Sequence, residues 1–223
     1  MSTFIGPIHY WLFEKIRVIN NREDYIFENA AAMCGETAEE LREQVWQTYG
    51  KKLPDVDLGE LIEHDNIHGW LQRQINIAES REAAFIKELL EVCGDAGVQL
   101  LGKAFREHGK AYGENARAQG KYELDTAPGI YKALNDYYLN GMPCDQADMV
   151  IESRSTAFIW DKGAYTQLPN WKRVGVDAKV MNGFYEMWLG AFVDGANKAF
   201  GFRSVNCEST ARNVVARYEI YKK

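Results

Sequence analysis

The feature that most constrains the fold is a segment of about sixty residues that occurs twice. Ile8-His9-Tyr10-Trp11-Leu12 returns 59 positions later as Ile67-His68-Gly69-Trp70-Leu71. The same offset aligns Arg22-Glu23 with Arg81-Glu82, Cys34-Gly35 with Cys93-Gly94, and Gly50-Lys51 with Gly109-Lys110. Residues 8–51 and 67–110 share 12 identities in 44 gapless positions, where ordinary composition gives about two to four. We infer an internal duplication, with repeats at about 4–55 and 63–114.

Capping signals at equivalent positions predict three helices in each repeat. The predicted starts are Pro7, Asn21 and Thr37 in the first copy and Asp65, Ser80 and Asp95 in the second. Glycines 35 and 94 are predicted to end helices, both copies reach a glycine again at 50 and 109, and the last helix is expected to extend past Gly113 into a linker. Because neither copy can bury its apolar face alone, we expect the two copies to pack about a pseudo-twofold axis.

The remainder of the chain changes its period. A helix is predicted to start at Thr126, and alternating residues predict one long strand from Met149 to Trp160, followed by a turn at 161–163. An amphipathic helix over about 177–200 precedes strands at 202–207 and 213–221. The predicted class is α+β, with a duplicated helical bundle over 4–118 and a small unit with an antiparallel sheet over 125–223.

Composition excludes several classes of partner. The chain has 223 residues and a net charge of −6, with no basic run, so we expect no nucleic-acid partner. No apolar run is long enough to span a membrane, and the first residues lack a secretory signal. Four widely spaced cysteines favour free thiols and a cytoplasmic protein.

Histidines are the candidate metal ligands. His9 and His68 occupy equivalent positions at predicted helix starts, where a neutral imidazole suits a ligand for a divalent metal such as zinc. His64 and His68 form an HxxxH pair, which requires one unbroken helix through both. The alternative is that each histidine caps its own helix and binds no metal. Cys34 and Cys93 are also equivalent, and either form a thiol pair or are buried structural cysteines.

Charged strand residues are the candidates for binding an acidic substrate. Glu152 and Arg154 alternate on the predicted long strand, and Arg217 and Glu219 alternate on the last one. If these strands pair, the four charges form a cluster. Inside a cavity covered by the Trp188 helix, Arg154 or Arg217 would hold a substrate carboxylate, whereas on an open face the same charges form an ion-pair ladder.

Several segments resemble a known family. They are Cys34-Gly35-Glu36-Thr37 with Trp46, Cys93-Gly94-Asp95 with His108-Gly109, and the tail from Trp188 through Asp194-Gly195 and Cys207 to Tyr218-Glu219-Ile220. Together they resemble the L-2-amino-thiazoline-4-carboxylic acid hydrolase-like proteins, and the tail is also similar to 4-vinyl reductase-like small-molecule-binding domains. The resemblance implies hydrolysis, with Cys207 and Asp194 as catalytic candidates and Trp188 in substrate binding. Cysteines expected on the central strand and closing helix are replaced by other residues, Phe158, Trp160, Gly190 and Ala191.

Three functional hypotheses follow. The first is a cytosolic hydrolase acting on a small acidic heterocycle or amide that contains nitrogen or sulfur. The second is a non-catalytic sensor or carrier for a hydrophobic ligand, a tetrapyrrole or a metal. The third is an assembly protein that forms a homodimer through the duplicated bundle. Metal content, a bound chromophore and the oligomer mass distinguish them.

Overall fold

A computed structural model describes residues 5–205 and 214–223. It confirms the α+β class, because helices dominate and the strands form one small antiparallel sheet. Within these residues, no helix has both the length and the apolarity needed to cross a bilayer.

The chain divides into two compact units. Unit 1 comprises the described residues up to Leu101 together with Pro169–Ala178, and unit 2 comprises Gly102–Leu168 together with the described residues from Lys179 onward. The division falls inside helix α4 (Ile67–Ala118), whereas the sequence placed it beyond residue 118. No turn-forming residues mark the boundary between the two units in the sequence, because this boundary lies within a helix.

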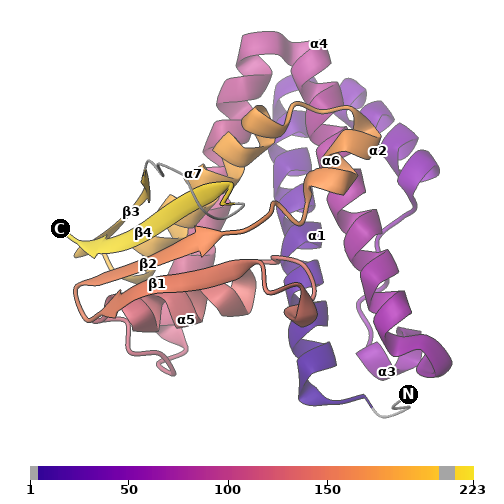
Figure 1. Ribbon diagram of the computed structural model, residues 1–223. Coiled ribbons are helices and arrows are strands. Elements are labelled where there is room, and N and C mark those ends of the chain that lie inside the picture. The colour runs from indigo at the N-terminus through magenta and orange to yellow at the C-terminus, as the bar shows by residue number, and fades with distance from the viewer. Residues whose placement is uncertain (1–4, 206–213) are drawn as a thin grey trace. The chain divides into compact units, whose positions relative to one another are not determined.

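Unit 1 is built on two long helical segments that run parallel. Helix α1 (Pro7–Cys34) and the first half of α4 lie side by side and run in the same direction (Figure 1). Contacts between equivalent or nearly equivalent residues fix the register, from His9 with His68 to Phe13 with Trp70 and Phe27 with Phe85. The duplicated segments therefore meet about an axis parallel to the helices.

A heptad pattern explains this parallel packing. Residues at alternating spacings of three and four on α1 are buried, namely His9, Leu12, Ile16, Ile19, Glu23, Ile26 and Ala30. The same offsets on α4 give His68, Leu71, Ile75, Ala78, Glu82, Phe85 and Leu89, all of them buried except His68. Spacing of this kind produces a left-handed, in-register seam between two helices. The helices thus bury their faces against each other.

Two reciprocal ion pairs lie within the seam. The Arg22 guanidinium donates to Glu82 at 2.6 and 2.8 Å, and the Arg81 Nε donates to Glu23 at 2.5 Å. All four side chains are at most 2% exposed. Because Arg22 and Arg81 are duplication partners, as are Glu23 and Glu82, the two bridges are equivalent by pseudosymmetry. The centre of the seam therefore holds these four charges as two matched pairs.

The predicted helix starts at Asn21 and Ser80 are wrong, because α1 and α4 run through these positions without a break. The glutamates that follow these positions, Glu23 and Glu82, bind arginines in the seam. The predicted breaks at Gly35 and Gly94 are confirmed, since their backbones are nearly identical, with φ and ψ of 54° and −126° at Gly35 and 53° and −130° at Gly94. Positive φ favours glycine at both positions.

Gly50 and Gly109 have diverged. Gly50 ends helix α2 (Glu36–Tyr49) with a φ of 94°, whereas α4 continues through Gly109 to Ala118, in line with the expected extension past Gly113. In unit 2, a Cβ at Gly109 would lie 2.4 Å from the Trp188 carbonyl oxygen, and one at Gly113 would lie 2.1 Å from that of Phe192. These glycines let α4 approach helix α7 (Ala178–Ala196) closely.

Short elements connect the main ones. In unit 1, α3 (Leu58–Leu61) and the 3₁₀ turn η1 (His64–Asn66) precede α4. Helix α6 (Leu168–Val174) follows the first hairpin, and the 3₁₀ turn η2 (Pro143–Asp145) precedes it. Helix α5 (Ala127–Tyr137) begins as predicted at Thr126, whose hydroxyl accepts from the Gly129 amide.

The sheet of unit 2 has the order β1-β2-β4-β3, with all neighbours antiparallel (Figure 1). Its strands are β1 (Asp148–Arg154), β2 (Ala157–Lys162), β3 (Phe200–Val205) and β4 (Ala216–Lys222). The predicted single strand from Met149 to Trp160 is therefore wrong, because the chain turns at residues 155–156 and forms a hairpin. The alternation of residue types continues through the tight turn, so the sequence pattern does not reveal that the strand is interrupted there.

The two faces of the sheet differ in character. Tyr131 of α5 stacks on Phe158 at 4.2 Å and contacts Trp160, so the face that carries these β2 side chains is covered. Asp161, which alternates with Trp160, lies on the opposite face, and Arg217 binds it there through two hydrogen bonds. One face is thus an aromatic core and the other carries ion pairs.

Candidate functional site

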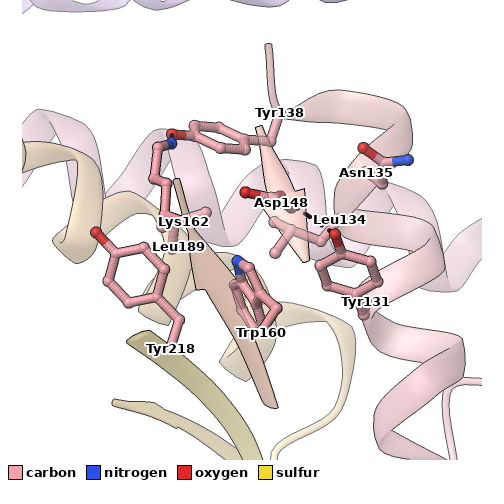
Figure 2. Close-up of a pocket in the computed structure, with 9 residues that line it drawn as sticks. All are labelled: Tyr131, Leu134, Asn135, Tyr138, Asp148, Trp160, Lys162, Leu189 and Tyr218. Atoms are coloured by element: carbon pink, nitrogen blue, oxygen red, sulfur yellow. Dashed lines mark hydrogen bonds between the residues drawn. The ribbon is translucent and has the colours of Figure 1, made fainter. Parts of the chain in front are cut away.

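The strongest candidate site is a small pocket in unit 2, between α5, α7 and the covered face of the sheet. Figure 2 shows the side chains that line it, Tyr131, Leu134, Asn135, Tyr138, Asp148, Trp160, Lys162, Leu189 and Tyr218. Its free space is about 10 Å³, close to what one water molecule requires. The exposed Asn135 marks its open side.

Lys162 is the central residue of this pocket. Its side chain is 1% exposed, and its Nζ donates to the Tyr138 hydroxyl at 2.8 Å and to the Asn140 Oδ1 at 2.9 Å. No carboxylate of the described residues lies within ion-pair distance of this Nζ. A buried ammonium is normally paired with an anion, because removing a charge from water is costly. The pocket therefore holds a cation whose protein partners are neutral.

Asp148 faces Lys162 from the neighbouring strand. The two residues are directly opposite in the β1–β2 register, so their side chains extend from the same face of the sheet. The Tyr131 hydroxyl donates to Asp148 Oδ2 at 3.2 Å. Lys162 Nζ donates to the Tyr138 hydroxyl and Asp148 accepts from that of Tyr131, so each of the two charged groups has a tyrosine partner.

Tyrosines supply neutral hydrogen-bond groups around the pocket. Burial, followed by the nearby Asp148, raises the pKa of Tyr131 well above its usual value, and burial, followed by Tyr138 and Tyr165, does the same for Tyr218. Both hydroxyls therefore stay protonated at neutral pH and can donate hydrogen bonds. Tyr218 donates to Asn182 at 3.3 Å. The pocket thus combines one cation, one carboxylate and protonated phenols.

The sequence did not single out these residues. The predicted turn at 161–163 contains Lys162, which in the structure ends β2, and the predicted strand starts after Asp148, which in the structure begins β1. A lysine at the end of a strand is usually exposed, so its burial has no sequence signal. The helix start at Thr126 did predict the helix that provides Tyr131, and Tyr138 follows directly after the end of that helix.

The predicted arginine clamp is not formed. Strand β2 lies between β1 and β4, so Glu152 and Arg154 do not pair with Arg217 and Glu219. Arg154 is 69% exposed and binds Glu152 of its own strand. A bulge between Val150 and Glu152 moves Glu152 and Arg154 to the face opposite Trp160. On that face, Arg217 and Glu219 form ion pairs with Asp161 and Arg203, which are not the partners that either prediction gave them.

The other predicted residues of this unit lie elsewhere. Trp188 is buried, and its indole N–H donates to His108 Nδ1 at 2.8 Å, so it belongs to the helix packing. Asp194 lies beside a groove of about 450 Å³ between α4 and α7 and accepts from Lys223 Nζ at 3.2 Å. Cys207 lies outside the residues that the structure describes.

In unit 1, the duplicated histidines meet. The Nε2 atoms of His9 and His68 are 3.2 Å apart. The Gly6 amide donates to His9 Nδ1 at 2.9 Å, so this nitrogen carries the lone pair, and the Nε2 proton of His9 points at His68. Burial and then His68 lower the pKa of His9, which favours the neutral ring. The structure thus brings together two of the three predicted metal ligands.

His64 and the cysteine pair have other surroundings. His64 lies in η1, outside α4, with its Nε2 3.3 Å from the Gly59 oxygen, so the HxxxH pair does not share a helix. Burial and the adjacent Cys93 raise the pKa of the Cys34 thiol, which donates to the Ala30 oxygen at 3.1 Å. Among the described residues, no three histidine, cysteine or acidic side chains gather as metal ligands do.

Comparison with known proteins adds no relative. No protein-family model matches the chain, and no curated protein or solved structure is significantly similar to it. The resemblance to the thiazoline-carboxylate hydrolase-like proteins therefore stays a prediction.

Proposed function

We propose that the protein is a hydrolase-like protein that binds a small acidic molecule in the Lys162 pocket and cleaves a C–N bond of a heterocycle or amide. The observation that carries this proposal is the buried Lys162 ammonium, whose partners in the protein are a hydroxyl and an amide oxygen. A ligand carboxylate would give this cation the anion that the described residues do not supply. Lys162 thus takes the role that the sequence assigned to Arg154 or Arg217.

The groups around Lys162 suit the hydrolysis of such a ligand. Asp148 is the carboxylate opposite the anchor, and it can act as a general base that takes a proton from an attacking water. The free space of about 10 Å³ corresponds to one such water. Protonated phenols, Tyr131 among them, are donors for the oxygen that becomes negative when water adds to the carbon.

The size of the pocket limits the ligand. Because the free space is only that of one water molecule, a substrate has to displace the side chains at the open side of the pocket. Asn135 is exposed there, and Tyr138 belongs to the segment that follows α5. We therefore expect a compact substrate, with its carboxylate directed inward to Lys162.

A second candidate is a non-catalytic sensor or carrier. Aromatic rings dominate the pocket, with Tyr131, Tyr138, Trp160 and Tyr218 in its walls. The described lining residues include no serine, threonine or cysteine. Binding of the same acids without turnover would favour this candidate over the hydrolase.

The test is a binding screen followed by a turnover assay. Small carboxylic acids that contain a ring nitrogen, ring sulfur or amide are titrated into the full chain by calorimetry, and hydrolysis is followed by proton NMR. Lys162→Met should weaken binding about 10- to 100-fold, because it removes one charge-assisted hydrogen bond. Lys132→Met, an exposed lysine on α5, is the matched control and should bind like wild type.

Equal losses in Lys162→Met and Lys132→Met would contradict the site. Asp148→Asn should bind the acid but lose turnover. Full turnover in Asp148→Asn would remove the general base from the mechanism while leaving the Lys162 anchor in place.

A further inference from the structure

We infer that His9 and His68 form a two-histidine site for a divalent transition metal of the zinc–copper group, at the point where α1 and α4 begin. This site lies within unit 1 and does not depend on the function proposed for Lys162. It needs no further protein ligand, because water completes the coordination of an accessible ion.

The spacing of the two nitrogens carries the inference. Metal–imidazole bonds are about 2.0–2.1 Å, so two nitrogens on one ion lie about 2.9 Å apart at a right angle and about 3.4 Å apart at a tetrahedral angle. The observed Nε2–Nε2 distance is 3.2 Å, within this range. The rings are inclined at 52° with their centroids 5.3 Å apart, so their edges converge and they do not stack.

The fold holds both nitrogens in this position. His9 and His68 are equivalent members of the heptad seam, and the next layer, Leu12 and Leu71, is buried beneath them. Trp70 packs against Phe13 in the same region, with ring centroids 6.1 Å apart. Because the two helices are parallel and in register, the duplication itself places one imidazole opposite the other.

The two histidines differ in solvent exposure. His9 is 9% exposed, whereas His68 is exposed. An ion can therefore arrive from the His68 side and keep its waters there, while His9 holds it from the inner side. The product is an open site with two protein ligands and solvent positions.

Metal binding requires a proton to move on one ring. In the structure, the Gly6 amide donates to His9 Nδ1, and the Nε2 proton of His9 lies between the rings. An ion at Nε2 takes the place of that proton, which transfers through solvent to Nδ1, so the ring stays neutral overall. The hydrogen bond from Gly6 is then lost, at a cost of about fivefold in affinity.

The test uses the full chain without a polyhistidine tag. Zn²⁺ is titrated by calorimetry after chelator treatment, and Cu²⁺ is added for electron paramagnetic resonance, in which nitrogen hyperfine structure reports the number of bound imidazoles. We expect one ion per chain and two nitrogens. His68→Ala and His9→Ala should each weaken binding at least tenfold, since loss even of an outer-shell partner costs about 10- to 100-fold.

His64→Ala is the matched control and should bind like wild type, because His64 lies outside the pair. Cys34→Ser excludes binding at the thiols. His68 is exposed, so its alanine variant should fold even if His9→Ala does not. Unchanged binding in His68→Ala, or a loss confined to His64→Ala or Cys34→Ser, would overturn the inference. None of these outcomes involves acid binding at Lys162, so the two proposals succeed or fail separately.

Discussion

Two regions of the molecule, the seam of unit 1 and the Lys162 pocket of unit 2, treat buried charge in opposite ways. In the seam, Arg22 and Arg81 each bind a glutamate of the other repeat, so these four charges are neutralised by the fold itself. In unit 2, Lys162 is equally buried, but its partners are a phenol and an amide. Charges that are already matched serve the architecture, whereas a buried cation with neutral partners is suited to an external anion.

Breaking one matched pair should have the largest effect. Arg22→Ala leaves the fully buried Glu82 without its guanidinium, and we expect a loss of about 3–5 kcal/mol in the free energy of unfolding. Urea denaturation measures this loss. The double variant Arg22→Met with Glu82→Leu should regain most of it, because both charges are removed together. Equal destabilisation of the single and double variants would contradict a paired-charge role.

Lys162 should show the opposite behaviour. Lys162→Met replaces a buried cation by an apolar chain of similar length, and we expect the unfolding free energy to change by less than about 1.5 kcal/mol. A bound acid at 100 times the wild-type Kd should stabilise the wild type by about 2.7 kcal/mol and Lys162→Met, which binds 10- to 100-fold more weakly, by only about 0.4–1.4 kcal/mol. Thermal unfolding with and without ligand measures both values. Strong destabilisation of the ligand-free variant would show that Lys162 is structural.

In unit 2, glycines bring two helices into close backbone contact, whereas the seam of unit 1 is packed by larger side chains. Gly113→Ala should cost about 1–3 kcal/mol, because the new Cβ would lie 2.1 Å from the Phe192 oxygen of α7. Gly183→Ala, in α7 with no atom within 4 Å, should stabilise by about 0.5–1 kcal/mol. Denaturant midpoints of the two variants should therefore move in opposite directions, and parallel shifts would argue against a close helix contact.

The smallest expected effect is a pH dependence at the histidine pair. Because the pKa of His9 in the folded protein is below 6.5, the folded state binds this proton less readily than the unfolded chain does. The contribution of neutral His9 to the free energy of unfolding is therefore fully present above pH 6.5, and it is lost as the pH falls through the pKa of His9 in the folded protein. With chelator present, the melting temperature of wild type should fall more between pH 7.5 and 5 than that of His68→Ala. An identical pH dependence of the melting temperature in the two proteins would argue against an interaction between His9 and His68.

The features that follow from the 59-residue repeat alone were the most predictable from the sequence. The 59-residue repeat predicted the two equivalent glycine breaks, and it identified His9 and His68 as equivalent while leaving open whether they meet or each cap their own helix. It failed at Asn21 and Ser80, because a capping signal and a buried ion pair use the same polar residues. Only the partner helix shows which applies, and that partner is about 60 residues away.

The site of unit 2 was less predictable for a related reason. The exposure of Lys162 depends on where α5 and its tyrosines lie over the sheet, and a lysine carries no local sign of burial. The bulge in β1 reversed the face of Glu152 and Arg154, which a strict alternation had placed beside Trp160. Register and packing were thus set by contacts between distant segments.

The parallel course of α1 and α4 also has a consequence for how the chain folds. A helix of 28 residues is about 42 Å long, and a second helix can start beside its first residue only if the chain travels back over that length. Helix α2, with 14 residues, covers about 21 Å, and residues 50–66 cover the rest. Every contact along the seam therefore closes a loop of nearly sixty residues. For a protein so rich in helix, this is a high contact order, and we expect it to fold more slowly than a bundle of antiparallel neighbours.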